Sequence, residues 1–316
     1  MIHLHCVTKT YGDVIALRGL DLEVGKGEIR AVLGPNGAGK TTTLSIISGL
    51  RSPDSGSVLV AGVDVAASPG EARKNVGFAP QELGIYPNAT VVENLRLFCH
   101  LRGVPRPEVA REIDRLGSRL LLDRLMSRRA GRLSGGEQRR LHTAIAMIGR
   151  PPILILDEPT VGADVQTRAA LIELIRELQK DGTTICYSTH YLTEVEALGA
   201  SISIFLEGRE AVSGSIADVV ARADEAPTLV LRFSEPQDLA DLPAAAMGTD
   251  WVAVAYPAAG SPLQYATGLL GDRVQSLTSL EIVRPTLETA YLKITNELQY
   301  ERRLGSAVRG SSETGV

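Results

Sequence analysis

The sequence predicts an α/β fold built around a mainly parallel sheet, followed by a smaller α+β unit. Over roughly the first 220 residues, short apolar runs alternate with stretches of helical period, as in a parallel sheet covered by helices. A glycine-rich turn separates one such run from the next helical stretch. The run Ile153 to Leu156 is wholly apolar, which is typical of a strand buried on both faces. From about Ala221 the pattern changes to strand-like segments followed by a helix.

The composition is that of a globular protein with about two domains. The chain has 316 residues, 44% hydrophobic and 22% charged, so it is neither disordered nor fibrous. A net charge of −4 and 4% aromatic residues argue against a protein that grips nucleic acid. The three cysteines are far apart, with no CxxC or Cys/His cluster, which predicts a reducing compartment and neither a disulfide framework nor a zinc site. The start of the chain lacks the apolar core of a secretory signal.

The first fifty residues contain three predicted strands and one helix. Apolar residues alternate with polar ones in two half-buried strands, at Ile2, Leu4, Cys6 and at Leu20, Leu22, Val24. A third strand, Glu28 to Leu33, leads into the glycine-rich turn, and a helix is predicted from Thr41 to Leu50. Strand, glycine turn and helix in this order are the context that a phosphate-binding loop requires.

The remainder of the α/β region continues this alternation. Residues from about Glu93 to Arg128 are predicted to be mostly helical, with a break at Pro105 and Pro107. Three further elements follow: a strand from Ile153 to Asp157, a helix from Gln166 to Gln179 and a strand from Thr183 to Ser188.

The last hundred residues predict a separate small unit. Strands are expected at Leu229 to Phe233 and Trp251 to Tyr256, and a helix at Thr286 to Leu298. The uncharged run Trp251 to Gly271 is long enough to span a membrane, but prolines and glycines interrupt it, so it predicts a strand, a turn and a short helix. Leu304 to Val316 has no apolar period and is predicted to be disordered.

The glycine-rich turn fits the pattern G-x-x-x-x-G-K-[ST]. Glycines allow backbone N–H groups to approach a triphosphate closely, and the helix that follows directs its positive end at the phosphates. Lys40 is expected to reach the outer phosphates and the Thr41 hydroxyl to bind Mg²⁺. The residues predicted to bind ATP in and after this loop are Gly34, Pro35, Asn36, Gly37, Ala38, Gly39, Lys40, Thr41 and Thr42.

Two acids, Asp157 and Glu158, follow the apolar run Ile153 to Leu156. Ligands of an open parallel sheet lie at the carboxyl ends of its strands, so Asp157 is expected beside the phosphate loop, holding Mg²⁺ through water. Glu158, one position further, is the candidate general base for the attacking water. A helix cap or an ion pair is the structural alternative for this pair.

A third motif, Leu133 to Gln138, reads Leu-Ser-Gly-Gly-Glu-Gln and precedes a helix. Ser134 and Glu137 have the spacing of a capping box, which accounts for part of the pattern. The glycines Gly135 and Gly136 leave backbone N–H groups bare, which favours a second anion site.

These three motifs together resemble the ATP-binding subunits of ABC transporters, in the ABC-2, daunorubicin-resistance-type multidrug exporter group. The resemblance covers about residues 2–215 and implies a P-loop NTPase fold with a mixed sheet core and a helical subdomain. It also implies a head-to-tail homodimer on ATP binding, with Ser134, Gly135, Gly136 and Glu137 contacting the ATP held by the partner subunit. MgATP, a separate transmembrane permease subunit and a place at the cytoplasmic face of a bacterial cell membrane are further implications; nucleic acid is not an expected partner.

The resemblance extends to single positions of this chain. Tyr11 matches the aromatic residue that stacks on adenine, Gln81 the glutamine that senses Mg²⁺ and the membrane partner, Asp164 the acid at the dimer interface, and His190 the switch histidine at the γ-phosphate. Taken alone, Tyr11 would be a packed surface aromatic and His190 a core histidine. Ala163 stands where this group usually has Leu or Val, and no catalytic position departs from the pattern, so both sites of a homodimer should hydrolyse ATP.

The predicted domains are an ATPase domain at 1–220 with a helical subdomain at about 83–140, an accessory domain at 221–300 and a disordered tail at 301–316. Residues in the helical subdomain are expected to receive a helix of the membrane partner, in a groove lined by Leu83, Ile85, Tyr86, Leu97 and Phe98. The segment Arg284 to Leu292 resembles the usual ending of drug-exporter ATPases, where dimer support or regulation is the proposed role and a stabilising appendix the alternative.

Other functions remain open at this point. A soluble ABC-type ATPase acting on nucleic acid or ribosomes usually carries two cassettes or a long coiled-coil insertion, and this chain shows neither. A small-molecule kinase has no use for Leu133 to Gln138. A nucleotide-dependent scaffold without turnover and an importer ATPase are two further alternatives. The cargo, drug-like, antibiotic, lipid or polysaccharide, is chosen by the membrane partner.

Overall fold

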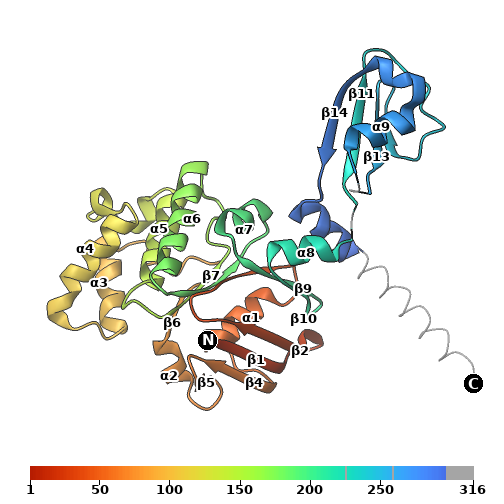
Figure 1. Cartoon of the computed structure of the whole chain (residues 1–316). Coiled ribbons are helices and arrows are strands. Elements are labelled where there is room, and N and C mark those ends of the chain that lie inside the picture. Colours follow the sequence, from red (N-terminus) through yellow and green to blue (C-terminus); the bar gives the residue numbers. More distant parts are fainter. Residues whose placement is uncertain (225, 258–259, 297–316) are drawn as a thin grey trace, which may run out of the picture. The chain divides into compact units, whose positions relative to one another are not determined.

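The computed structural model describes residues 1–224, 226–257 and 260–296 of the chain. Contacts divide the chain into two compact units, Met1–Ile216 and Ala217–Val316. Both are drawn in Figure 1, and each has its own sheets and core. The tail predicted at 301–316 lies outside the described residues. No helix in the described part combines the length and apolar character that crossing a bilayer requires.

The first unit is built on a six-stranded sheet with the order β10-β9-β3-β8-β7-β6. All neighbouring strands run parallel except β10, which pairs antiparallel with β9. The strands are β3 (Ile29–Leu33), β6 (Val76–Ala79), β7 (Ile153–Asp157), β8 (Thr184–Ser188), β9 (Ser201–Leu206) and β10 (Arg209–Gly214). Every residue of β7 and β8 is buried, which explains why β7 reads as an uninterrupted apolar run.

A second, antiparallel sheet of the first unit has the order β2-β1-β4-β5. Its strands are β1 (Ile2–Tyr11), β2 (Val14–Val24), β4 (Ser55–Val60) and β5 (Val63–Asp64). Side chains of both sheets and of the first helix share one core, which includes Leu4, Val58, Leu44 and Ile155. The mixed architecture therefore joins both sheets through a shared hydrophobic core.

The structure corrects the predicted burial of Cys6. Ile2 and Leu4 are buried as expected, but Cys6 is exposed and Val7 is buried in its place. The pairing of β1 shifts between Leu4 and Val7, where Cys6 has a left-handed φ of 50°. A β-bulge adds one residue to a strand, so the phase of the alternation changes after it.

Four helices alternate along the chain with strands of the first unit: α1 (Lys40–Ile47), α2 (Pro69–Lys74), α6 (Val165–Lys180) and α7 (Leu192–Leu198). The predicted helix Thr41 to Leu50 is three residues too long at its end, because Gly49 adopts a φ of 69° and its N–H bonds to Ile46. Between β6 and β7 the chain forms α3 (Val91–Leu101), α4 (Val109–Arg119) and α5 (Gly135–Ala146) (Figure 1). A 3₁₀ turn, Arg106–Glu108, separates α3 from α4 at the predicted proline break.

The second unit contains an antiparallel sheet of order β12-β13-β11-β14 and the helix α9 (Pro262–Leu270). The strands are β11 (Thr228–Phe233), β12 (Ala244–Met247), β13 (Trp251–Ala255) and β14 (Leu277–Val283). Alternate residues Leu229 and Leu231 pack with Val252 and Ala266 in a separate core. A short helix, α8 (Ile216–Arg222), begins at the boundary of the units, and residues 287–296 are helical.

Candidate nucleotide-binding site

The phosphate loop connects β3 to α1 and depends on glycine at two positions. A Cβ atom at Gly34 would lie 2.3 Å from the carbonyl oxygen of Phe205, and one at Gly39 would lie 2.8 Å from that of Ala16. Both glycines have a positive φ, 149° at Gly34 and 101° at Gly39. A side chain would clash at either position, so the backbone is free to approach a ligand only with glycine there.

Lys40 is the first residue of α1, and its ammonium group turns back over the loop. Nζ donates hydrogen bonds to the carbonyl oxygens of Gly34, at 2.6 Å, and Pro35, at 3.1 Å. Burial lowers the pKa of Lys40, while the carboxylates of Glu158 and Asp157 oppose that effect. Both hydrogen-bond acceptors are neutral carbonyl oxygens, so binding an anion would stabilise the buried ammonium group.

Asp157 ends β7 opposite Ser188, the last residue of β8. The Ser188 hydroxyl donates to Oδ1 of Asp157. The other carboxylate oxygen, Oδ2, is buried and has no hydrogen-bond partner among the described residues. A buried carboxylate oxygen without a donor is costly, and oxygen of this kind is a preferred ligand of Mg²⁺ or of its bound water.

Glu158, which follows β7, lies close to a side chain that follows β6 and to one that follows β8. Its backbone N–H donates to the carbonyl oxygen and to the hydroxyl of Ser188, at 3.1 and 3.0 Å, and its φ is 50°. Oε2 lies 3.4 Å from Nε2 of Gln81, and Oε1 lies 3.6 Å from Nδ1 of His190. Gln81, Glu158 and His190 therefore converge at the carboxyl edge of the sheet, where ligands of parallel sheets bind.

Ser134 and Asp164 belong to a second group of predicted site residues. Ser134 caps α5: its side chain accepts from the Glu137 N–H, and the Glu137 carboxylate accepts from the Ser134 N–H at 2.7 Å. Asp164 caps α6 and accepts from the Thr167 N–H at 2.8 Å, and a Cβ on Gly136 would lie 3.0 Å from Oγ1 of Thr167.

No hydrogen bond or ion pair joins the second group, Ser134 to Glu137 with Asp164, to Lys40, Gln81 or His190 within the described part of the chain. The hydrogen bonds of the described site residues therefore fall into two groups.

Tyr11 ends β1 with 38% of its surface exposed. Its ring has two cationic neighbours, Nζ of Lys9 at 5.6 Å and the guanidinium carbon of Arg51 at 5.2 Å from the ring centroid. An exposed ring of this kind is available for stacking on a planar ligand.

Known proteins are similar to this chain in sequence and in structure. Residues 17–161 match the family model described as ABC transporter. A linearmycin resistance ATP-binding protein of Bacillus subtilis is 35% identical over 70% of this chain and 71% of its own length. A Nod factor export ATP-binding protein of Cupriavidus pinatubonensis is 37% identical over 70% of this chain and 68% of its own length.

The chain belongs to the ATP-binding subunits of ABC transporters. It is accordingly an ABC-type ATPase. A molybdate/tungstate import ATP-binding protein of Pyrococcus horikoshii is also 37% identical over 70% of the chain, and the chain spans 64% of that protein. A solved dimeric ABC transporter cassette, MJ0796, superposes with a TM-score of 0.63 at 28% identity and covers 68% of this chain and 98% of the cassette.

A buried carboxylate of this ABC ATPase, which no sequence pattern marks, joins the segments at the ends of β7 and β8. Glu194 of α7 is 2% exposed. It accepts hydrogen bonds of 2.7 Å from the hydroxyls of Thr160, Tyr187 and Thr189, and Nε of Arg168 lies 3.4 Å away. Burial, and then the neighbouring Glu194, raise the pKa of Tyr187. Since Thr189 precedes His190 directly, Glu194 fixes the backbone that carries the histidine.

Helix α5 supplies a second link that the sequence did not reveal. Arg139 is buried and donates from Nη1 to the carbonyl oxygen of Gln81 at 2.9 Å. It thereby ties the helix that Ser134 caps to the segment carrying Gln81. Burial lowers the pKa of His142, one turn further along, to about 4, so this ring is neutral at pH 7.

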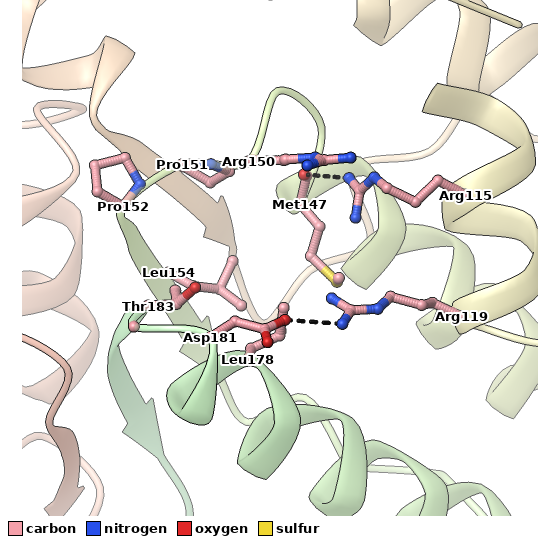
Figure 2. Close-up of a pocket in the computed structure, with 11 residues that line it drawn as sticks. Arg115, Arg119, Met147, Arg150, Pro151, Pro152, Leu154, Leu178, Asp181 and Thr183 are labelled. Atoms are coloured by element: carbon pink, nitrogen blue, oxygen red, sulfur yellow. Dashed lines mark hydrogen bonds and ion pairs between the residues drawn. The ribbon is translucent and has the colours of Figure 1, made fainter. Parts of the chain in front are cut away.

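A cavity of about 540 Å³ lies at the opposite edge of the sheet (Figure 2). It is lined by Arg150 and Pro151, which precede β7, and by Thr183, which precedes β8. Figure 2 shows Arg119 of α4 paired with Asp181 across it, at 2.8 Å. Its position at the amino ends of these strands separates it from the nucleotide site of the ABC ATPase.

Proposed function

We propose that this chain energises export through a separate membrane-embedded subunit, by binding and hydrolysing MgATP between two copies of itself. The observation that carries the proposal is the convergence of Gln81, Glu158 and His190 beside the buried, unpartnered oxygen of Asp157. This convergence supports the assignment of a base, a metal ligand and a polar sensor to the edge of the sheet that also bears the phosphate loop.

ATP binding is assigned to the loop Gly34 to Thr42, with Lys40 on the outer phosphates and Tyr11 on the adenine. The oxygen donors of Thr41, Gln81 and Asp157 would hold Mg²⁺, directly or through water, and the unpartnered Oδ2 of Asp157 supports this assignment. The bound ion supplies positive charge to the phosphate oxygens. Lys40 exchanges two neutral carbonyl partners for phosphate oxygens, which gives the buried ammonium a counter-charge.

Hydrolysis is assigned to Glu158 acting as general base. Its carboxylate takes a proton from water as the water oxygen bonds to the γ-phosphorus and the bond to the ADP oxygen breaks. The side chain is 13% exposed, and Gln81 and His190 orient its two oxygens. His190 in turn contacts the γ-phosphate, so loss of that phosphate removes one of its contacts.

A second copy completes the site in this proposal. No hydrogen bond or ion pair joins the group Ser134 to Glu137 to Lys40 within the described residues of one chain. The glycines after Ser134 nevertheless begin a helix whose N–H groups favour an anion. Head-to-tail pairing brings this group to the partner's ATP, with Asp164 at the interface. The dimeric state of the MJ0796 cassette supports this arrangement.

A measurement of the molecular mass in solution tests whether the chain dimerises on binding ATP. The Glu158→Gln chain is expected to be dimeric with MgATP, because it binds nucleotide without turning it over, and to dissociate when nucleotide is removed. A Glu158→Gln chain that stays monomeric with saturating MgATP contradicts the proposal.

The membrane partner is expected to dock on the apolar surface formed by Leu83, Ile85, Tyr86, Leu97 and Phe98. Tyr86 is 53% exposed, and its ring centroid lies 6.0 Å from that of Phe98 on α3. The buried amide of Asn94 accepts from the Tyr86 N–H at 2.7 Å and donates to its carbonyl oxygen at 3.0 Å, which holds this loop against α3. Tyr86→Arg should uncouple export while ATP binding survives, and unchanged export would count against this surface.

Export rather than import is supported by the names of the Bacillus and Cupriavidus relatives and by the ending Arg284 to Leu292, while the Pyrococcus relative favours an importer. The proposed cargo is a drug-like, antibiotic, lipid or polysaccharide molecule, and the proposed place is the cytoplasmic face of a bacterial membrane. Co-purification with an integral membrane protein, followed by ATP-dependent cargo uptake into inside-out vesicles, tests direction directly. Cargo leaving such vesicles on ATP addition would establish import.

A further inference from the structure

The β-bulge at Cys6 exposes two neighbouring side chains that a regular strand would place on opposite faces. His5 and Cys6 are both exposed, between the buried Leu4 and Val7. The register of β1 shifts here against both neighbours, β2 and β4. The left-handed backbone of Cys6 therefore creates a local pair of metal-binding side chains where alternation would leave only one.

Strand β2 adds a carboxylate to this pair. Oδ1 of Asp21 lies 3.0 Å from Nδ1 of His5 and accepts from the Cys6 N–H at 2.9 Å. One imidazole nitrogen, one sulfur and one carboxylate oxygen from His5, Cys6 and Asp21 lie within 4.8 Å of one another. We propose that these three side chains form a site for Zn²⁺ or a similar divalent transition metal, separate from the nucleotide site.

The geometry suits such an ion. Bond lengths of about 2.0 Å to nitrogen and oxygen and about 2.3 Å to sulfur put tetrahedral ligand atoms roughly 3.2–3.8 Å apart. Exposed side chains reach this spacing from 4.8 Å by small rotamer changes. The hydrogen bond from the Cys6 N–H orients the Asp21 carboxylate, as partners of metal ligands commonly do. Water would be the fourth ligand.

Binding requires a change of protonation at Cys6. The thiol proton passes to solvent as the sulfur bonds to the metal, and His5 binds in its neutral form through Nδ1. The metal takes the place of the hydrogen bond between His5 and Asp21. It would join β1 to β2, so occupancy should also raise the unfolding temperature.

The surroundings favour a cation. A cavity of about 500 Å³ opens beside the cluster and is lined by His5, Asp21, Glu23 and Glu210 among others. Oε1 of Glu210 is buried and has no hydrogen-bond partner in the described part of the chain. The guanidinium of Arg30, also in the lining, is neutralised by Glu28 at 2.7 Å. The expectation of no zinc site rests on the absence of a CxxC or Cys/His cluster. The adjacent pair His5 and Cys6 gains its third ligand, Asp21, only through strand pairing.

Cobalt binding to the untagged, full-length, reduced chain tests the site. Cys99 and Cys186 are buried, and burial raises their pKa to about 11 and about 12, so a sulfur-to-cobalt charge-transfer band reports Cys6. Titration with Co²⁺ should produce this band with one equivalent bound, and Zn²⁺ should abolish it. Zn²⁺ should also protect Cys6 from alkylation, measured by mass spectrometry.

Matched variants locate the binding. Cys6→Ser should lose the charge-transfer band. Asp21→Asn removes a direct ligand and should weaken Zn²⁺ binding by about tenfold or more, at least the loss typical of removing a partner that only orients a ligand. His100→Gln removes an exposed histidine outside the cluster and should bind as the parent does. Absence of the band in the parent, or equal affinity in Asp21→Asn and His100→Gln, would overturn the proposal.

Discussion

The carboxyl and amino edges of the six-stranded sheet, where the strands end and begin, differ in whether their charged side chains have charged partners. At the carboxyl edge, Oδ2 of Asp157 has no hydrogen-bond partner among the described residues, and Lys40 donates to two neutral carbonyl oxygens. At the amino edge, Arg119 is paired with Asp181 and Arg115 with Glu112, although a cavity of about 540 Å³ opens there. Polar groups without a partner, rather than open volume, therefore distinguish the edge to which we assign nucleotide binding from the edge that bears this cavity.

The largest effect should come from removing the cation of the carboxyl edge. Lys40→Ala is expected to abolish ATP binding, because the phosphates lose their buried counter-charge. Lys74→Ala removes an exposed lysine at the end of α2 and is the matched control, with parent affinity. A calorimetric titration in which Lys40→Ala binds ATP as the parent does would contradict this assignment.

Glu158→Gln should come next, with ATP binding kept and the steady-state hydrolysis rate lowered by about 100-fold or more, the contribution typical of a general base. Glutamine preserves the shape of the side chain but does not accept a proton. Phosphate release measured at saturating MgATP checks this, and a parent-like rate would move the base to another residue.

The next largest effect, on stability, is expected at Glu194. Glu194→Ala removes the acceptor of three buried hydroxyls and the ion-pair partner of Arg168. The free energy of unfolding should therefore fall by about 3–5 kcal/mol. Glu196→Ala, on the exposed side of the same helix, should change stability by less than about 0.5 kcal/mol. Denaturant unfolding of both variants separates them, and equal midpoints would count against the network.

The smallest effect is expected at the amino edge. Arg119→Ala breaks a pair whose side chains are 32% and 58% exposed, so stability should fall by about 0.2–1 kcal/mol with no change in hydrolysis. A marked loss of ATPase activity in Arg119→Ala would show that the two edges do not differ as described.

The sequence revealed those features whose cause is local. The glycines of the phosphate loop, the capping box at Ser134 and the buried run of β7 each follow from neighbouring residues. The contacts of Glu194 could not be predicted from the sequence. Its three hydroxyl partners lie near the ends of β7 and β8 and come together only when the sheet forms. The bulge at Cys6 was likewise invisible, since alternation alone continues through that position. Strand β12 has only alanines and a methionine, with no alternation to mark it.

Mixing two inactive chains tests the composite site most directly. Lys40→Ala lacks one half of the site and Ser134→Arg the other, so each chain alone should be inactive. A head-to-tail heterodimer of the two contains one intact site, formed by Lys40 of one chain and Ser134 of the other. Mixing is therefore predicted to restore ATP hydrolysis that neither variant shows alone. A mixture that remains inactive, although heterodimers form and both chains are folded, would contradict the account.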